Sequence, residues 1–156
     1  MGLTQAQVDQ LRAEQPFTYQ ATILFADNAA VGASGADTPV QILDVDFVCT
    51  SLVVFSRNQD TGILVTAGDV GAAGNTNAAS DIDPAVLIQI EESGANRSWF
   101  QVPVDAALFA RPAALPRPRL MRRATSFVVR CTLQRDVTTA TDSITTRVLF
   151  HGFHVY

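Results

Sequence analysis

The sequence predicts an all-β fold: a jelly-roll-like antiparallel β-sandwich of about eight strands with a short N-terminal helical arm. From residue 16 onward, apolar and polar residues alternate with a period of two, which is typical of strands with one buried face. No helical pattern separates successive strands, so the parallel sheets of βαβ proteins are excluded. The chain has 156 residues, 47% of them hydrophobic, which favours one domain with its own core. A closed barrel is the alternative architecture.

Residues 1–15 are expected to form the helical arm, and residues 16–156 the sandwich domain. Thr4 and Gln7 have the spacing of a capping box, and Pro16 ends the helix. The apolar residues that recur at near-helical spacing in this arm are Leu3, Val8 and Leu11. A helix this short is marginal in water, so we expect it to dock on its own domain or on a partner.

Strand-like segments follow the arm in order. The predicted strands span residues 17–25, 40–48, 51–57, 63–66, 86–91, 97–104, 125–135 and 143–156. Residues 86–91 and 97–104 should form a hairpin, after which Asp105 caps a single turn over residues 106–110. The three prolines of residues 111–120 exclude a helix or a central strand, so this segment should run extended along a surface or an edge. Residues 68–84 form the longest irregular stretch.

The last predicted strand is apolar on both faces. Its two apolar faces consist of Ile144, Val148 and Phe150 on one side and Leu149, Phe153 and Val155 on the other. Because one face of a sandwich strand normally contacts solvent, this pattern indicates that the second face meets another subunit.

The chain offers little chemistry for catalysis or metal binding. His151 and His154 are three apart on a strand and therefore point to opposite faces, so they cannot bind one ion together. No serine lies in a glycine-flanked nucleophile turn, and no glycine-rich phosphate loop is present. The oxygen-bearing residues that calcium would need occur in one loop, at Asp69, Asn75, Asn77, Asp81 and Asp83, but their spacing favours solvated turn residues. We therefore expect no enzyme activity, no metal and no cofactor.

The two cysteines, Cys49 and Cys131, both lie in strand-like segments. Free cysteine is among the most buried residue types, so two separate buried thiols are the favoured interpretation. A disulfide remains the alternative if the two strands face each other.

Charge is distributed unevenly along the chain, whose formal net charge is −4. All eleven basic residues are arginines, and residues 111–130 contain six of them without any acidic residue. This segment is either a solvated edge or a protein interface, since arginine pairs bidentately with carboxylates. Nucleic-acid binding is disfavoured because the chain is acidic overall and no aromatic residue lies between Phe109 and Phe127. The candidate contact residues here are Arg117, Arg119, Arg122 and Arg123.

Two segments carry a resemblance to a known family. The run LPRPRLMRRATSFVV at residues 115–129 resembles a pattern in small virion proteins of tailed bacteriophages, in which a proline-rich extended segment leads into a strand. The closing residues 147–156, RVLFHGFHVY, are similar to the last strand of the same proteins. The residues PFTY that begin at Pro16, after a short helix, are compatible with this family.

The resemblance implies a jelly-roll decoration (cement) protein that binds the outside of an icosahedral head. Such proteins bind at junctions between major capsid subunits, commonly as dimers or trimers, and strengthen the shell. The implied partners are the major capsid protein and other copies of this chain, with no nucleic acid and no membrane. Neither a secretory signal nor an apolar stretch of membrane-spanning length is visible, so we expect synthesis in a cytoplasm. The resemblance implies that this is the cytoplasm of a host bacterium and that the protein is located on the outer capsid surface. The candidate interface residues are Leu3, Val8, Leu11, Arg117, Arg119, Arg122, Arg123, Phe153 and Val155.

Two other functions remain open at this point. The chain is alternatively a component of a phage tail, connector or fibre. A jelly-roll carbohydrate-binding module is the second alternative, but it would need exposed aromatic rings to stack on sugars. Trp99 is the only tryptophan and lies beside Phe100, and one of this pair is expected in the core.

Overall fold

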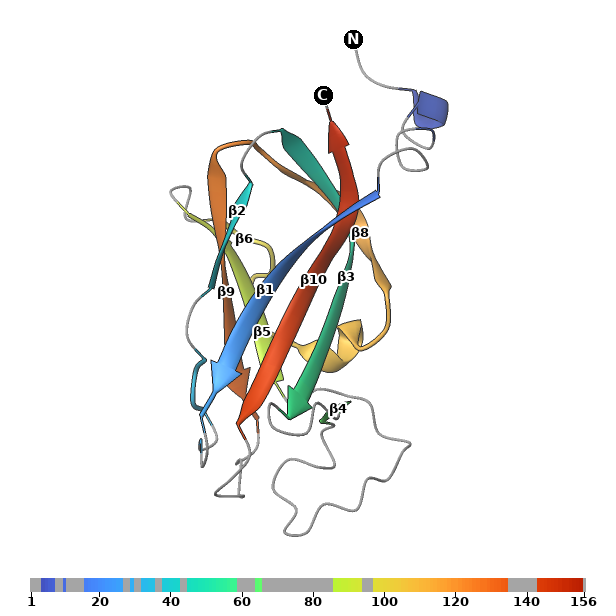
Figure 1. Ribbon diagram of the computed structural model, residues 1–156. Coiled ribbons are helices and arrows are strands. Elements are labelled where there is room, and N and C mark those ends of the chain that lie inside the picture. Colours follow the sequence, from blue (N-terminus) through green and yellow to red (C-terminus); the bar gives the residue numbers. More distant parts are fainter. Residues whose placement is uncertain are drawn as a thin grey trace.

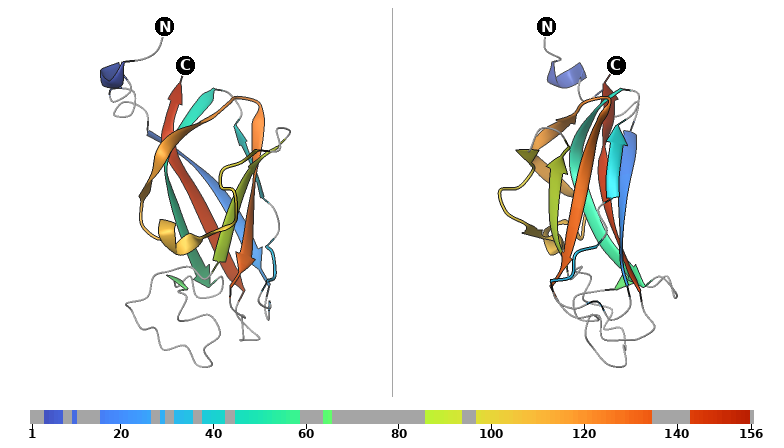
Figure 2. Two further views of the ribbon diagram at one scale, coloured as in Figure 1. Left: turned by 180° about the vertical axis from the view of Figure 1, so that it is seen from behind. Right: turned by 90° about the vertical axis from the view of Figure 1, so that its left-hand side faces the viewer.

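The computed structural model describes residues 4–7, 10, 16–26, 29, 32–35, 38–42, 45–58, 64–65, 86–93, 97–134 and 143–155. Within these ranges the chain is almost entirely β, in two five-stranded antiparallel sheets that pack face to face (Figures 1 and 2). The expectation of an all-β fold with two packed sheets is therefore confirmed.

The first sheet has β10 (Ile144–Val155) at its centre, between β1 (Pro16–Phe25) and β3 (Asp46–Asn58). The far side of β3 pairs with β4 (Leu64–Val65) and with β8 (Ala113–Met121). The proline-rich segment thus lies at a sheet edge, as predicted, because proline cannot donate to strands on both sides.

The second sheet has the order β2 (Thr38–Ile42), β9 (Thr125–Leu133), β5 (Val86–Glu92). Two short strands, β6 (Arg97–Ser98) and β7 (Val104–Asp105), pair with β5 on its other side. A 3₁₀ turn, η1 (Ala106–Phe109), follows, and the Asp105 carboxylate accepts a hydrogen bond from the Ala107 N–H at 2.9 Å. The predicted hairpin and the predicted cap are both present.

The core lies between the inward faces of the two sheets. Trp99 contacts both sheets. Its ring packs edge to face against Phe127 of the second sheet and against Phe150 of the first sheet, at centroid distances of 5.9 and 5.7 Å. Phe100 is only half-buried and packs against Phe109. Trp99 is therefore the core member of the pair, and it presents no ring surface on which a sugar would stack.

Two strand boundaries differ from the prediction. The chain forms β2 and then one long strand, β3, where the sequence predicted strands over 40–48 and 51–57. The wrong boundary follows from a bulge in β3. His151 pairs with Ser51 and Gly152 with Cys49, so Thr50 has no partner residue on β10. At the bulge the alternation of buried and exposed residues shifts by one position. In the sequence, this shift looks like the end of one strand and the start of another. The predicted strand 97–104 is also wrong in its middle, where the chain leaves β5 and inserts Trp99 into the core.

The first turn of the arm has the predicted cap. Thr4 N–H donates to the Gln7 side-chain oxygen at 2.9 Å, and Gln7 N–H donates to the Thr4 hydroxyl at 3.4 Å. Residues 5–7 and residue 10 are helical. The apolar positions Leu3, Val8 and Leu11 lie outside the described residues, so the helical arm as a whole stays a prediction.

Cys49 and Cys131 are both buried and free. They belong to strands of different sheets, β3 and β9, and burial raises the pKa of each thiol to about 12. The favoured interpretation of two separate buried thiols is confirmed.

Candidate interaction surface

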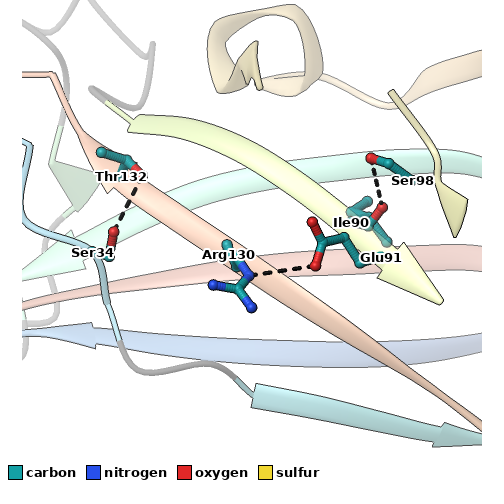
Figure 3. A network of polar contacts seen from close by, with 6 residues as sticks. All are labelled: Ser34, Ile90, Glu91, Ser98, Arg130 and Thr132. Atoms are coloured by element: carbon teal, nitrogen blue, oxygen red, sulfur yellow. Dashed lines mark hydrogen bonds and ion pairs between the residues drawn. The ribbon is translucent and has the colours of Figure 1, made fainter. Parts of the chain in front are cut away.

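The outer faces of the two sheets differ in chemistry. On the second sheet, Arg130 forms an ion pair with Glu91 at 3.5 Å, and the Thr132 hydroxyl lies 3.5 Å from that of Ser34 (Figure 3). On this face the described arginine therefore has an acidic partner. The outer face of the first sheet combines polar and apolar side chains. Polar residues dominate on β1, whereas β3, β8 and β10 place on it the apolar residues Val48, Val53, Phe55, Leu120, Leu149, Phe153 and Val155.

One end of this outer face collects segments that are far apart in the sequence. Pro16, Phe153, Val48 and Leu120 form a row of cross-strand partners through β1, β10, β3 and β8. Directly paired residues of antiparallel strands share a face, so these four side chains are neighbours. The root of the arm, the end of the last strand and the end of the arginine–proline segment therefore meet at one place, at the upper end of β10 in Figure 1.

The turn between β8 and β9 adds two arginines to this end. Its shape is fixed by Asp46, whose carboxylate accepts the Arg123 N–H at 2.8 Å, and by the Ala124 N–H, which donates to the Ile42 carbonyl at 2.7 Å. Ala124 has a φ of 59°, in the left-handed region. Arg122 and Arg123 are exposed, and no described acidic residue forms an ion pair with either. We call Pro16, Leu120, Arg122, Arg123 and Val155 the terminal corner.

The other two candidate arginines have different environments. Arg119 is opposite Cys49 in the register, so it points inward at the sheet edge, where its guanidinium donates to the Trp99 carbonyl at 3.1 Å. This bond links the two sheets, although Arg119 remains exposed at the sheet edge. Arg117 lies in the bulge of residues 115–118, where four residues of β8 face the single residue Thr50 of β3, and its side chain is exposed.

Phe153 requires a correction as an interface candidate. It lies on the outer face, as the alternation predicts, but only 2% of it is exposed in the single chain. Such a side chain adds almost no surface to an interface. Val155, two residues later, is half-buried and does present surface.

The sequence did not reveal an aromatic cluster on the inner side of the same end. The His154 ring stacks on Phe17 at 4.3 Å and meets Phe47 at 5.9 Å, and the Tyr19 hydroxyl lies 3.4 Å from His154 Nε2. Alternation alone places these rings on one face of their strands, but it does not show that the ends of three strands, β1, β3 and β10, come together. His151 lies on the outer face, with Nδ1 2.8 Å from the Thr18 hydroxyl. The two histidines thus point to opposite faces, as predicted.

The remaining candidate sites from the sequence are the metal-binding ones. No group of three or more potential metal ligands occurs among them. The predicted loop oxygens of Asp69, Asn75, Asn77, Asp81 and Asp83 lie outside the described part of the chain. In the part that is described, no helix is long and apolar enough to cross a membrane.

Comparison with known proteins assigns no family. No family model matches this chain, and no curated protein or solved structure is significantly similar to it.

Proposed function

We propose that this chain is a non-enzymatic virion protein that binds the outer surface of a tailed-phage capsid as a decoration (cement) subunit. The resemblance of residues 115–129 and 147–156 to such proteins suggests the class. The terminal corner, with the arm of residues 1–15 that precedes Pro16, is the proposed contact with the capsid. The proposed partners are the major capsid protein and other copies of this chain.

The jelly-roll part of the proposal is supported by the order of strand pairing. If β6 and β7 are counted as one interrupted strand and the short β4 is set aside, eight strands remain in the described chain. The first of them pairs with the last (β1 with β10), the second with the seventh (β2 with β9), the third with the sixth (β3 with β8) and the fourth with the fifth (β5 with β6). A long hairpin rolled into two sheets has this nested pairing, which is the pattern of a jelly roll.

The observation that carries the functional proposal is the convergence at the terminal corner. Pro16, Phe153 and Leu120 come from the two ends of the domain and from the arginine–proline segment, yet they lie in one cross-strand row. Arg122 and Arg123 are held beside them by Asp46. A cationic, partly apolar corner at the base of an arm suits attachment to a larger assembly, because arginine and apolar residues are both enriched in interface cores.

Binding to purified heads tests the proposal. Heads that lack both tails and this chain are mixed with the wild-type protein, with a variant that lacks residues 1–15, and with Arg122→Glu/Arg123→Glu. We expect the wild-type protein to bind in many copies per head, and both variants to remain folded but bind weakly. Absence of wild-type binding to tail-free heads would contradict the proposal and favour a tail or connector component. Unchanged binding of both variants would show that the terminal corner is not the contact.

A further inference from the structure

The middle of the first sheet's outer face carries a second surface, away from the terminal corner. Leu149 of the central strand pairs with Val53 on one side, and Phe55 lies in the next row. Leu24, on β1, is 48% exposed at the border of this group. We call Leu24, Val53, Phe55 and Leu149, with the two arginines described next, the Phe55 patch.

Two arginines are neighbours of Phe55 on this face. The guanidinium of Arg57 is stacked over the ring, with Cζ 5.5 Å from its centroid. Arg147 is the cross-strand partner of Phe55 on β10. Neither arginine forms an ion pair with a described acidic residue, whereas Arg130 on the opposite sheet pairs with Glu91. Acidic residues are absent from β1 and β10, and β3 has one, Asp46, at its other end.

We infer that the Phe55 patch is a second docking surface, and that its occupant is a protein surface that is apolar in the middle and carries carboxylates at its border. The charge of the patch supports this occupant: Arg57 and Arg147 are fixed by the sheet and supply positive charge without a described counter-ion. Carboxylates of a partner would pair with them as Leu149 and Val53 lose water. The inference rests on the proposed function, which makes the capsid shell that partner.

A second copy of the chain suits this patch poorly. A two-fold dimer brings a patch onto the same patch of its partner, which here places Arg57 and Arg147 of both copies together. Like charges that lose water in an interface cost several kcal/mol, and neither β1 nor β10 provides a carboxylate to offset this cost. Nucleic acid suits it poorly as well, because phosphates contact arginines but leave Leu149, Val53 and Phe55 without an apolar counterpart.

Matched variants on the two outer faces test the inference on the same tail-free heads. Leu149→Glu and the double variant Arg57→Gln/Arg147→Gln alter the Phe55 patch. Gln89→Glu and Arg130→Gln make the corresponding changes on the outer face of the second sheet. Circular dichroism and thermal unfolding identify any variant that fails to fold; Thr145→Glu, which adds an acid beside Arg57 without removing an apolar residue, then replaces Leu149→Glu.

We expect the patch variants to bind heads about 30-fold or more weakly, and the second-sheet variants to bind within about twofold of wild type. Added salt should weaken the wild-type protein more than Arg57→Gln/Arg147→Gln, because the contact is partly ionic. Patch variants that bind like wild type would overturn the inference and leave the proposed function intact, whereas a wild-type protein that does not bind heads would overturn both.

Two solution measurements separate the other occupants. A wild-type dimer in light scattering that Leu149→Glu converts to monomer would overturn the inference in favour of a second copy. Binding of a short DNA duplex that is lost in Arg57→Gln/Arg147→Gln would overturn it in favour of nucleic acid. We expect neither result.

Discussion

A buried pair of hydroxyl groups in the first sheet provides a stringent test of how the core is stabilised. Ser56 and Thr146 are cross-strand partners, and their hydroxyl oxygens are 2.8 Å apart. They are the polar side chains buried in the described part of the core, with exposures of 3% and 0%. Each hydroxyl satisfies the other, so removing one leaves its partner without a bond in an apolar environment. That loss costs about 1–3 kcal/mol for an uncharged group.

The losses of stability in the two single variants should therefore not add in the double variant. Ser56→Ala and Thr146→Val should each lower the free energy of unfolding by about 1–3 kcal/mol, whereas the double variant should return to within about 1 kcal/mol of wild type, since no hydroxyl is then stranded. Urea unfolding followed by the fluorescence of Trp99 measures all four proteins, because this tryptophan is packed between the two sheets. Losses that simply add in the double variant would refute the reasoning.

Three further predictions concern other parts of the fold. In Gly152→Ala the new Cβ would clash with the Val48 carbonyl oxygen, so the strands must separate and the free energy of unfolding should fall by about 2–3 kcal/mol in urea unfolding. Each buried thiol, Cys49 and Cys131, has a pKa of about 12 when folded against an ordinary value of 9.0, so above pH 9 the unfolded chain loses protons that the folded chain keeps. Stability should then fall as pH rises, by up to about 1.4 kcal/mol per pH unit per thiol, and a Cys49→Ala/Cys131→Ala variant should show a smaller slope in pH-dependent urea unfolding. Asp46→Ala removes the carboxylate that fixes the β8–β9 turn and should cost about 1 kcal/mol and weaken head binding, measured by unfolding and by co-sedimentation.

The fold class could be predicted because its signals are local. The alternation in residues 16–25 correctly places Ala21, Ile23 and Phe25 inward, and Asp105 caps the turn that was expected of it. Strand boundaries were less predictable where a long-range contact decides them. The bulge at Thr50 exists because Gly152 approaches the β3 backbone closely, and this contact joins residues that are about a hundred positions apart.

The candidate site was predictable as a set of residue types but not as an arrangement. Charge counting singled out Arg122 and Arg123 as contact candidates, and both are exposed at the terminal corner. It equally singled out Arg119, whose guanidinium bonds to the Trp99 carbonyl, because composition does not show which side of an edge strand an arginine occupies. The alternation of the last strand correctly placed Phe153 on the outer face. It could not predict that only 2% of this residue is exposed, because exposure depends on the packing around it.

The arginine–proline segment can now be divided by physical role. Pro116 and Pro118 lie in the edge strand β8 and have no N–H to donate, so they prevent another strand from adding to this side of the sheet. Arg117, exposed between them, adds charge to the same blocked edge. With strand addition prevented there, a partner that approaches the first sheet at the β8 edge has to contact its outer face or its terminal corner. Arg57 and Arg147 lie on the outer face, and Arg122 and Arg123 lie at the terminal corner; none of them forms an ion pair with a described acidic residue. The proposed contacts are therefore assigned to these two surfaces rather than to the edge.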